Sequence, residues 1–282
     1  MSKTLESAYN FKELCNSFPS LKEFVFVNKY QRETIDFGNP QAVKNLNKAL
    51  LFSNHKIKYW DFPDSNLCPP IPGRLAYIYQ LETLLKSSSI TKNISILDIG
   101  TGASCIYPIL GNSVYNWQFV GTEIDENSIK SAQKIIDKNN LEASISLRHQ
   151  PDKAFILNGI IKESDQFSAS MCNPPFYNSQ EEADQSHKRK LKGLKIKGNA
   201  RNFGGIQNEL WYTGGEKAFI HNYLYQSSLF KTKCHWFTSL VSKKENLKSI
   251  YASLNKLKAT QMKTIPMQLG NKITRIVAWT FI

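Results

Sequence analysis

Residues 94–104 read Ile-Ser-Ile-Leu-Asp-Ile-Gly-Thr-Gly-Ala-Ser, an apolar run that ends in an acidic residue and two closely spaced glycines. A short apolar run bounded by glycine is typical of a buried strand that turns tightly at its carboxyl end. Gly100 and Gly102 let backbone amides approach a ligand without a Cβ in the way. The stretch therefore predicts a strand of an α/β sheet, followed by a ligand-binding turn that we call the glycine loop (residues 98–104).

Strands and helices alternate after this loop. Alternation of this kind is typical of a parallel sheet with helices on both faces. The chain ends in a predicted strand, which fits a sheet finished by an antiparallel hairpin. We expect further strands at 117–123, 143–149, 167–172, 235–241 and 272–281, and helices at 127–139, 217–230 and 244–256.

The N-terminal part has a different pattern. Apolar residues recur at helical spacing after Pro40 and again between Arg74 and Leu85. The prolines and glycine of residues 68–74 predict a stiff loop without regular structure, which places Arg74 at the entrance of the second helix. We therefore expect a small, mostly helical unit at 1–89 and an α/β unit at 90–282.

The composition fits a globular protein without disulfides or metal. A chain of 282 residues with 41% apolar residues can fill a large core. No run of eighteen apolar residues occurs and the start lacks the apolar core of a signal peptide, which predicts a cytoplasmic protein. The five cysteines and five histidines show no metal-binding spacing. Cys172 has no histidine nearby in the sequence, so we interpret it as a buried cysteine rather than a nucleophile.

The formal charge of +13 is unevenly distributed. Residues 90–185 carry 7 Lys and Arg against 12 Asp and Glu, residues 186–203 carry 7 against none, and residues 229–282 carry 10 against 1. Segregated positive charge suits a polyanionic partner, because each neutralised phosphate releases counterions. The alternative is a solvated, lysine-rich surface.

The glycine loop favours S-adenosylmethionine (SAM) over a nicotinamide cofactor. The dinucleotide fingerprint requires a third small residue where this chain has Cys105, and residues 106–108 do not read as a clean helix. SAM has no pyrophosphate to seat on a helix, so two glycines are enough. Glu123 ends the next strand, where a carboxylate can accept both ribose hydroxyl protons. A purely structural turn is the alternative for the two glycines alone.

Residues 173–176, Asn-Pro-Pro-Phe, form a second motif at a strand end, which we call the acceptor loop. An exocyclic amine on a base is a poor nucleophile, because its lone pair is delocalised into the ring. The Asn173 side-chain oxygen and the Pro174 carbonyl can hold both N–H groups and turn the lone pair outward, while Pro175 helps to fix the backbone. Phe176 supplies an aromatic face for a flipped base. The motif predicts methylation of an amino group; a proline-rich structural turn is the alternative.

These motifs resemble those of a known family, the bacterial 23S rRNA adenine-N6 methyltransferases of the F type, which have a eukaryotic relative acting on a small nuclear RNA. The resemblance implies a class I SAM-dependent methyltransferase fold, with a Rossmann-like, mostly parallel seven-stranded sheet and an antiparallel C-terminal hairpin. It also implies methylation of the N6 amine of one adenine in large-subunit ribosomal RNA. The residues that carry it are 34–44, 67–74, 98–108, 122–125, 172–176, 208–210 and 214–216.

The resemblance assigns roles to single residues. It implies that Arg74 contacts the SAM carboxylate, that Gly100 and Ser104 line the amino-acid end, and that Glu123 holds the ribose. Ala154 is expected near the adenine ring of SAM. By the same resemblance, the acceptor loop holds the target adenine.

One departure from the family concerns RNA binding. Relatives usually open with a basic segment before the aromatic that here is Tyr9 or Phe11, and residues 1–8 provide little of it. The basic insertion at 186–203 is expected to compensate, and the unit at 1–89 to bind RNA and cover SAM; an insertion without a role is the alternative. The RNA-binding residues expected in the insertion are Lys188, Arg189, Lys190, Lys192, Lys195, Lys197 and Arg201.

Two other functions remain open from the sequence. Release-factor methyltransferases use a similar motif to modify a protein glutamine, but they usually have Tyr where this chain has Phe176. A non-catalytic RNA-binding assembly factor is the second alternative. The leading hypothesis implies 23S-type ribosomal RNA or a large-subunit precursor as partner, no membrane and a monomeric enzyme.

Overall fold

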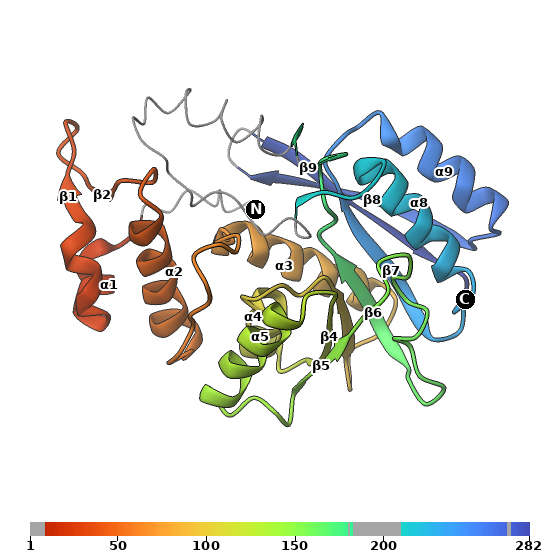
Figure 1. The fold of residues 1–282 in the computed structure, drawn as a ribbon, viewed down its shortest axis with the longest axis horizontal. Helices are drawn as coiled ribbons and strands as arrows, with labels where there is room; N and C mark the ends of the chain where they lie inside the picture. Colours follow the sequence, from red (N-terminus) through yellow and green to blue (C-terminus); the bar gives the residue numbers. More distant parts are fainter. Residues whose placement is uncertain (1–8, 180, 183–209, 270–271) are drawn as a thin grey trace.

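The structure, a computed structural model, describes residues 9–179, 181–182, 210–269 and 272–282. Its centre is a seven-stranded sheet with the order β5-β4-β3-β6-β7-β9-β8. The strands β3 to β7 pair in parallel, whereas β9 runs antiparallel to both β7 and β8 (Figure 1). The predicted class I methyltransferase fold is thereby confirmed. The strands are β3 (Ser95–Ile99), β4 (Gln118–Glu123), β5 (Ile145–His149), β6 (Phe167–Cys172), β7 (Cys234–Val241), β8 (Gln261–Leu269) and β9 (Lys272–Thr280).

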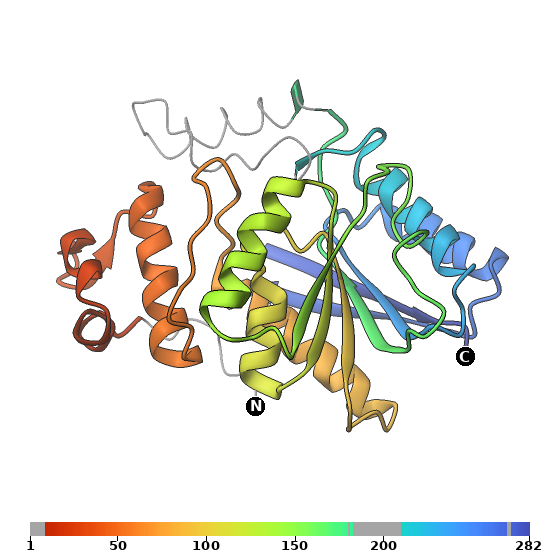
Figure 2. The same ribbon diagram turned by 60° about the horizontal axis from the view of Figure 1, so that its bottom comes forward.

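Helices cover both faces of the sheet (Figures 1 and 2). One face packs against α3 (Ile71–Ser87), α4 (Ile106–Tyr115) and α5 (Glu126–Lys138), and the other against α8 (Gly215–Ser227) and α9 (Asn246–Lys256). Successive side chains on a strand point to opposite faces. Ile96 of β3 therefore joins the first core and Leu97 joins the second.

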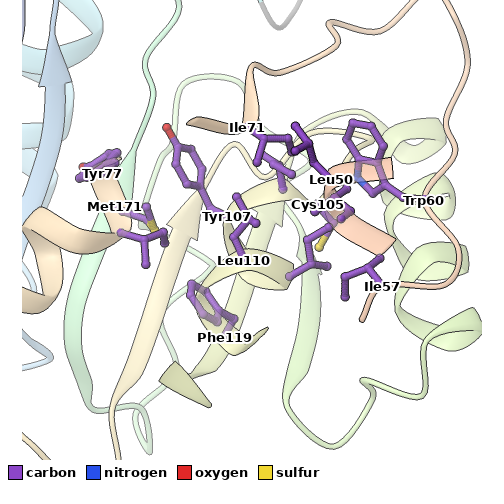
Figure 3. Close-up of a cluster of buried hydrophobic side chains, with 14 of the residues drawn as sticks. Leu50, Ile57, Trp60, Ile71, Tyr77, Cys105, Tyr107, Leu110, Phe119 and Met171 are labelled. Carbon is purple, nitrogen blue, oxygen red and sulfur yellow. The ribbon is translucent and has the colours of Figure 1, made fainter. Parts of the chain in front are cut away.

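The N-terminal segment adds helices and a short hairpin beside the first face. Asn39 caps α2 by accepting a hydrogen bond from Gln41 N at 3.0 Å. In Figure 3, Leu50, Ile57 and Trp60 gather around Cys105, so this segment shares one apolar core with the sheet layer. A domain boundary at residue 89 stays a prediction. The elements are α1 (Phe11–Ser17), η1 (Pro19–Phe24), β1 (Val25–Val27), β2 (Glu33–Ile35) and α2 (Pro40–His55).

Two local predictions were wrong. The stiff loop ends earlier than expected, because α3 begins at Ile71 and includes Pro72 and Arg74 in its first turn. Likewise α4 begins at Ile106 and includes Pro108 in its first turn. Proline is tolerated there because the first N–H groups of a helix have no intrahelical acceptor. Arg74 is thus a helical residue one turn inside α3.

The final hairpin contains a strand that the sequence reading did not locate. β8 lies at the edge of the sheet and carries Pro266. Proline cannot donate a ladder hydrogen bond and is confined to edge strands, bulges or strand starts. Pro266 therefore made the sequence of this edge strand resemble that of a loop.

The order in which the chain forms the strands indicates where the candidate site lies. From β3 the chain moves to β4 and β5 on one side, and then crosses back to β6 on the other side. Ligands bind at such a switch point, outside the carboxyl ends of the strands. Within the described ranges, no helix combines the length and apolar character of a membrane span, and no group of three or more His, Cys, Asp or Glu side chains is arranged to hold a metal ion.

Candidate active site

The loops at the carboxyl ends of β3, β4, β5 and β6 enclose a cavity of about 380 Å³. Two of the predicted site residues, the buried Pro174 and the partly buried Phe176, are not part of the cavity lining. The predicted RNA-binding residues (Lys188, Arg189, Lys190, Lys192, Lys195, Lys197 and Arg201) lie outside the described residues. The predicted residues that line the cavity are Arg74, Gly100, Gly102, Ser104, Glu123, Ala154, Asn173 and Pro175.

The glycine loop presents open backbone to this cavity. Gly100 and Gly102 have φ values of +72° and +64°, which L side chains rarely adopt. A Cβ built at Gly100 would meet no atom within 4 Å, so the space in front of it is available to a ligand. The other side of the loop is fixed, since Gly100 N and Thr101 N both donate to Thr122 O, at 3.0 and 2.9 Å.

Glu123 holds the glycine loop against the turn that follows β4. One carboxylate oxygen, Oε2, accepts from Gly102 N at 3.0 Å. The other, Oε1, accepts from Ile124 N at 2.8 Å and from Asp125 N at 3.1 Å. The residue is only 7% exposed, so these charge-assisted bonds form in a poorly solvated place. Glu123 therefore shapes the loop in addition to lining the cavity.

A buried polar atom without a partner belongs to another residue of the cavity lining, Arg74. Arg74 Nη1 donates to the Tyr107 hydroxyl at 2.9 Å, but Arg74 Nε has no hydrogen-bond partner among the described residues. Burial raises the pKa of Asp98 to about 7, while a side-chain hydrogen bond with Thr101 and the nearby Arg74 charge oppose part of this rise. Buried polar groups are nearly always paired. An unpaired donor on a residue that lines a cavity, such as Arg74 Nε, indicates that a polar ligand belongs there.

Residues from the N-terminal segment position the loop from outside. The Trp60 indole N–H donates to Ser104 O at 2.8 Å. Asn47 Nδ2 donates to Pro69 O at 2.9 Å, and Pro69 lines the cavity with Leu67. The sequence offers no signal for these contacts, because Trp60 lies 44 residues from its partner.

A polar bridge from α8 holds the loop after β5. Gln226, 4% exposed, accepts with Oε1 from Ile156 N at 2.8 Å, and donates with Nε2 to Ala154 O at 3.2 Å. Asn222 Nδ2 donates both to Ala154 O at 3.0 Å and to the Tyr212 hydroxyl at 3.1 Å. Ala154 and Tyr212 both line the cavity. The bridge therefore connects the two sides of the site.

The acceptor loop is held by backbone pairing. Phe176 N and Tyr177 N both donate to Leu210 O at 3.1 Å, and Tyr212 N donates back to Tyr177 O at 3.0 Å. This pairing places Trp211 in the cavity wall beside Asn173 and Pro175. The sequence reading missed Trp211, although it stands between two stretches of the family resemblance.

Cys172 is the last residue of β6 and is 1% exposed. Burial raises the pKa of its thiol well above the usual value, and the nearby Asp98 raises it further. A thiol in this environment stays protonated and inert. This agrees with its interpretation as a structural cysteine.

Comparisons with known proteins agree with the fold. A family model described as RNA methyltransferase matches residues 3–282. The Ribosomal RNA large subunit methyltransferase F of Christiangramia forsetii is 50% identical over 278 residues, covering 98% of this chain and 97% of that protein. The protein of the same name from Flavobacterium johnsoniae is 50% identical over 287 residues, covering 98% and 91%.

Solved structures of a human protein are also similar. The human METTL16 catalytic domain in complex with MAT2A 3′UTR hairpin 1 has a TM-score of 0.84 and 29% identity, covering 100% of this chain and 96% of that one. The N-terminal domain of human METTL16 in complex with SAH has a TM-score of 0.80 and 27% identity, covering 100% and 99%. The resemblance inferred from the sequence motifs is confirmed, and the chain belongs to the RNA methyltransferase family.

Proposed function

We propose that the protein methylates the N6 amine of an adenine in large-subunit ribosomal RNA and uses SAM as the methyl donor. The observation that carries this proposal is that one cavity joins the glycine loop and Glu123 to Asn173 and Pro175. A donor site and an amine-holding site on facing walls of one cavity are what a direct transfer requires.

The donor half fits SAM in its polar groups. Arg74 is placed to bind the carboxylate, since its Nε is buried without a partner and its guanidinium lies 5.3 Å from the Tyr107 ring, which fixes its direction. The open backbone at Gly100 receives the amino-acid end, and Glu123 receives the ribose hydroxyls. Ala154 and its neighbours border the adenine. The human relative bound to SAH supports SAM as the donor.

The acceptor half prepares the amine. SAM supplies an electrophilic methyl group at this site. The Asn173 side-chain oxygen and the Pro174 carbonyl accept the two N–H groups of the target amine and direct its lone pair toward the donor half. The amine proton leaves to water after transfer, because the methylated cation is acidic. Phe176 adjoins this wall and supplies the stacking face for the flipped base.

The substrate class follows from charge and from the relatives. The bacterial relatives are named for the large ribosomal subunit, and the human relative was solved with an RNA hairpin. The segregated positive charge suits the same polyanion. Either 23S-type rRNA or its precursor particle fits, and the enzyme acts in the cytoplasm as a monomer, since one chain supplies both halves of the cavity. A protein glutamine acceptor has no support from these relatives.

The test is radiolabelled methyl transfer from SAM to rRNA purified from a strain that lacks this gene. Digestion to nucleosides should place the label in N6-methyladenosine. Deproteinised rRNA and large-subunit precursor particles are assayed side by side, together with purified release factor. Label in another nucleoside, or on the release factor alone, would refute the proposal.

A further inference from the structure

The indole N–H of the half-buried Trp211 differs from those of three fully buried tryptophans of this protein. The N–H groups of Trp60, Trp236 and Trp279 each donate to a protein oxygen at 2.8 to 2.9 Å. The Nε1 atom of Trp211 is also buried, yet it has no acceptor among the described residues. An unpaired buried N–H costs roughly 1–3 kcal/mol, so an indole kept in this state indicates a partner that arrives with the substrate.

The position of Trp211 suits the target base rather than a distant ligand. Trp211 lines the cavity together with Asn173 and Pro175. Its backbone pairs with Tyr177, the residue after the acceptor loop. Leu210 O accepts from Phe176 N in that loop, and Tyr212 N donates to Tyr177 O. The indole is therefore fixed relative to the atoms that hold the target amine, and a base seated there lies beside it.

The chemistry of the two walls is complementary. Asn173 Oδ1 and the Pro174 carbonyl are acceptors and bind the amino group of adenine. An adenine ring also carries nitrogen acceptors, which need a donor once the base leaves its stack. Tryptophan is a donor only. We propose that Trp211 Nε1 donates a hydrogen bond to a ring nitrogen of the flipped adenine and so helps to select adenine over bases that present an N–H there.

This inference rests on the proposed function, and Trp211→Phe is the variant that tests it. Phenylalanine keeps an aromatic ring in the wall and removes the N–H donor, together with part of the indole surface. Loss of one such bond should lower kcat/KM for rRNA by about 10- to 100-fold. SAM affinity, measured by calorimetry, should stay unchanged. Trp236→Phe is the matched control, because it also removes one buried indole N–H, but it does so at Ser88, outside the cavity lining.

The decisive readout pairs the variant with altered substrates. After the modified adenine is mapped, it is replaced in ligated rRNA by 1-deaza-, 3-deaza- or 7-deazaadenosine, each of which exchanges one ring nitrogen for C–H. One analogue should lower the kcat/KM of the wild-type enzyme about as much as Trp211→Phe lowers kcat/KM on natural rRNA. The same analogue should not lower the kcat/KM of the Trp211→Phe enzyme any further, because the variant and the analogue remove the same hydrogen bond.

Three results would overturn the inference. Equal use of all three analogues by the wild-type enzyme would show that no ring nitrogen is bound in this way. If the losses in kcat/KM caused by the variant and by the analogue multiply, the two changes remove different interactions. A fall in SAM affinity in Trp211→Phe without any analogue effect would assign the N–H to the donor half. Failure of the wild-type enzyme to methylate natural rRNA and particles would instead reject the proposed function, and this inference with it.

Discussion

The glycine loop and the acceptor loop sit at the same edge of the sheet, but they are held by different means. Side chains from distant parts of the chain fix the glycine loop, through the Glu123 carboxylate and the Trp60 indole. The acceptor loop depends on two prolines and on backbone pairing with Leu210. The acceptor loop also contains no ionisable residue, whereas the glycine loop starts with buried Asp98. Changes to the first loop should therefore alter binding and stability, and changes to the second should alter turnover.

The largest effect is expected for Asn173→Ala. Removal of one positioned hydrogen-bonding group commonly costs about 10²–10³ in rate. We expect such a loss in kcat, with SAM affinity and the unfolding transition unchanged, because Asn173 is partly exposed and acts on the acceptor. Methylation kinetics, calorimetry and thermal unfolding measure the three quantities. Asn178→Ala is the control, since it removes an exposed amide outside the cavity lining; near-wild-type turnover in Asn173→Ala would remove the acceptor loop from the mechanism.

The next effect concerns stability at the glycine loop. The folded-state pKa of Asp98, about 7, lies above its ordinary value of 3.8, so the folded protein favours the protonated form. The stabilising contribution of this group is present at acidic pH and is lost as pH rises toward 7. Asp98→Asn removes the titration. Its unfolding free energy relative to wild type should increase by roughly 2–3 kcal/mol between pH 5 and pH 8.

Urea denaturation at the two pH values measures this difference. Asp137→Asn is the control, because Asp137 is exposed on α5. A difference that is the same at pH 5 and pH 8 would show that Asp98 is charged throughout this range and would contradict the assignment.

A smaller effect is expected for Glu123→Gln. An amide can accept only through its oxygen, so either the Gly102 N–H or the pair from Ile124 and Asp125 loses its acceptor. SAM affinity should fall about tenfold, corresponding to roughly 1–2 kcal/mol, while kcat at saturating SAM stays within about twofold. Calorimetry and steady-state kinetics separate the two. Glu126→Gln, an exposed change three residues later, should have no effect. A fall confined to kcat would place Glu123 on the acceptor side.

The smallest effect is expected for the bridge from α8, which touches both halves. Gln226→Met removes all hydrogen bonds to the loop after β5 and should weaken SAM binding about fivefold, whereas Gln226→Glu keeps the acceptor for Ile156 N and should lose less. Calorimetry on both variants provides the comparison. Gln133→Met on α5 is the control, since its side chain bonds only Asp137 at the surface. Equal SAM affinity in the wild type, Gln226→Met and Gln226→Glu would limit Gln226 to a structural role.

The two loops also differ in what the sequence could predict. Glycine turns and the Asn-Pro-Pro-Phe motif carry their chemistry in neighbouring residues, so their place at the strand ends was predictable. The supporting contacts were not, because Gln226 lies 70 residues from Ile156 and such pairs are brought together only by the fold. Trp211 was missed for the same reason, since its place in the wall depends on pairing with Tyr177. Pro266 made the edge strand β8 hard to recognise, because proline is unusual within strands and occurs there only at edges, bulges or strand starts.

The most direct test of the account is a crystal structure with S-adenosylhomocysteine, the demethylated product of the donor. We predict that its carboxylate lies against Arg74, that its ribose hydroxyls contact Glu123, and that its sulfur faces Asn173 across the cavity. This arrangement would show that one cavity serves both donor and acceptor. A ligand seated elsewhere, or with its sulfur turned away from Asn173, would contradict the account.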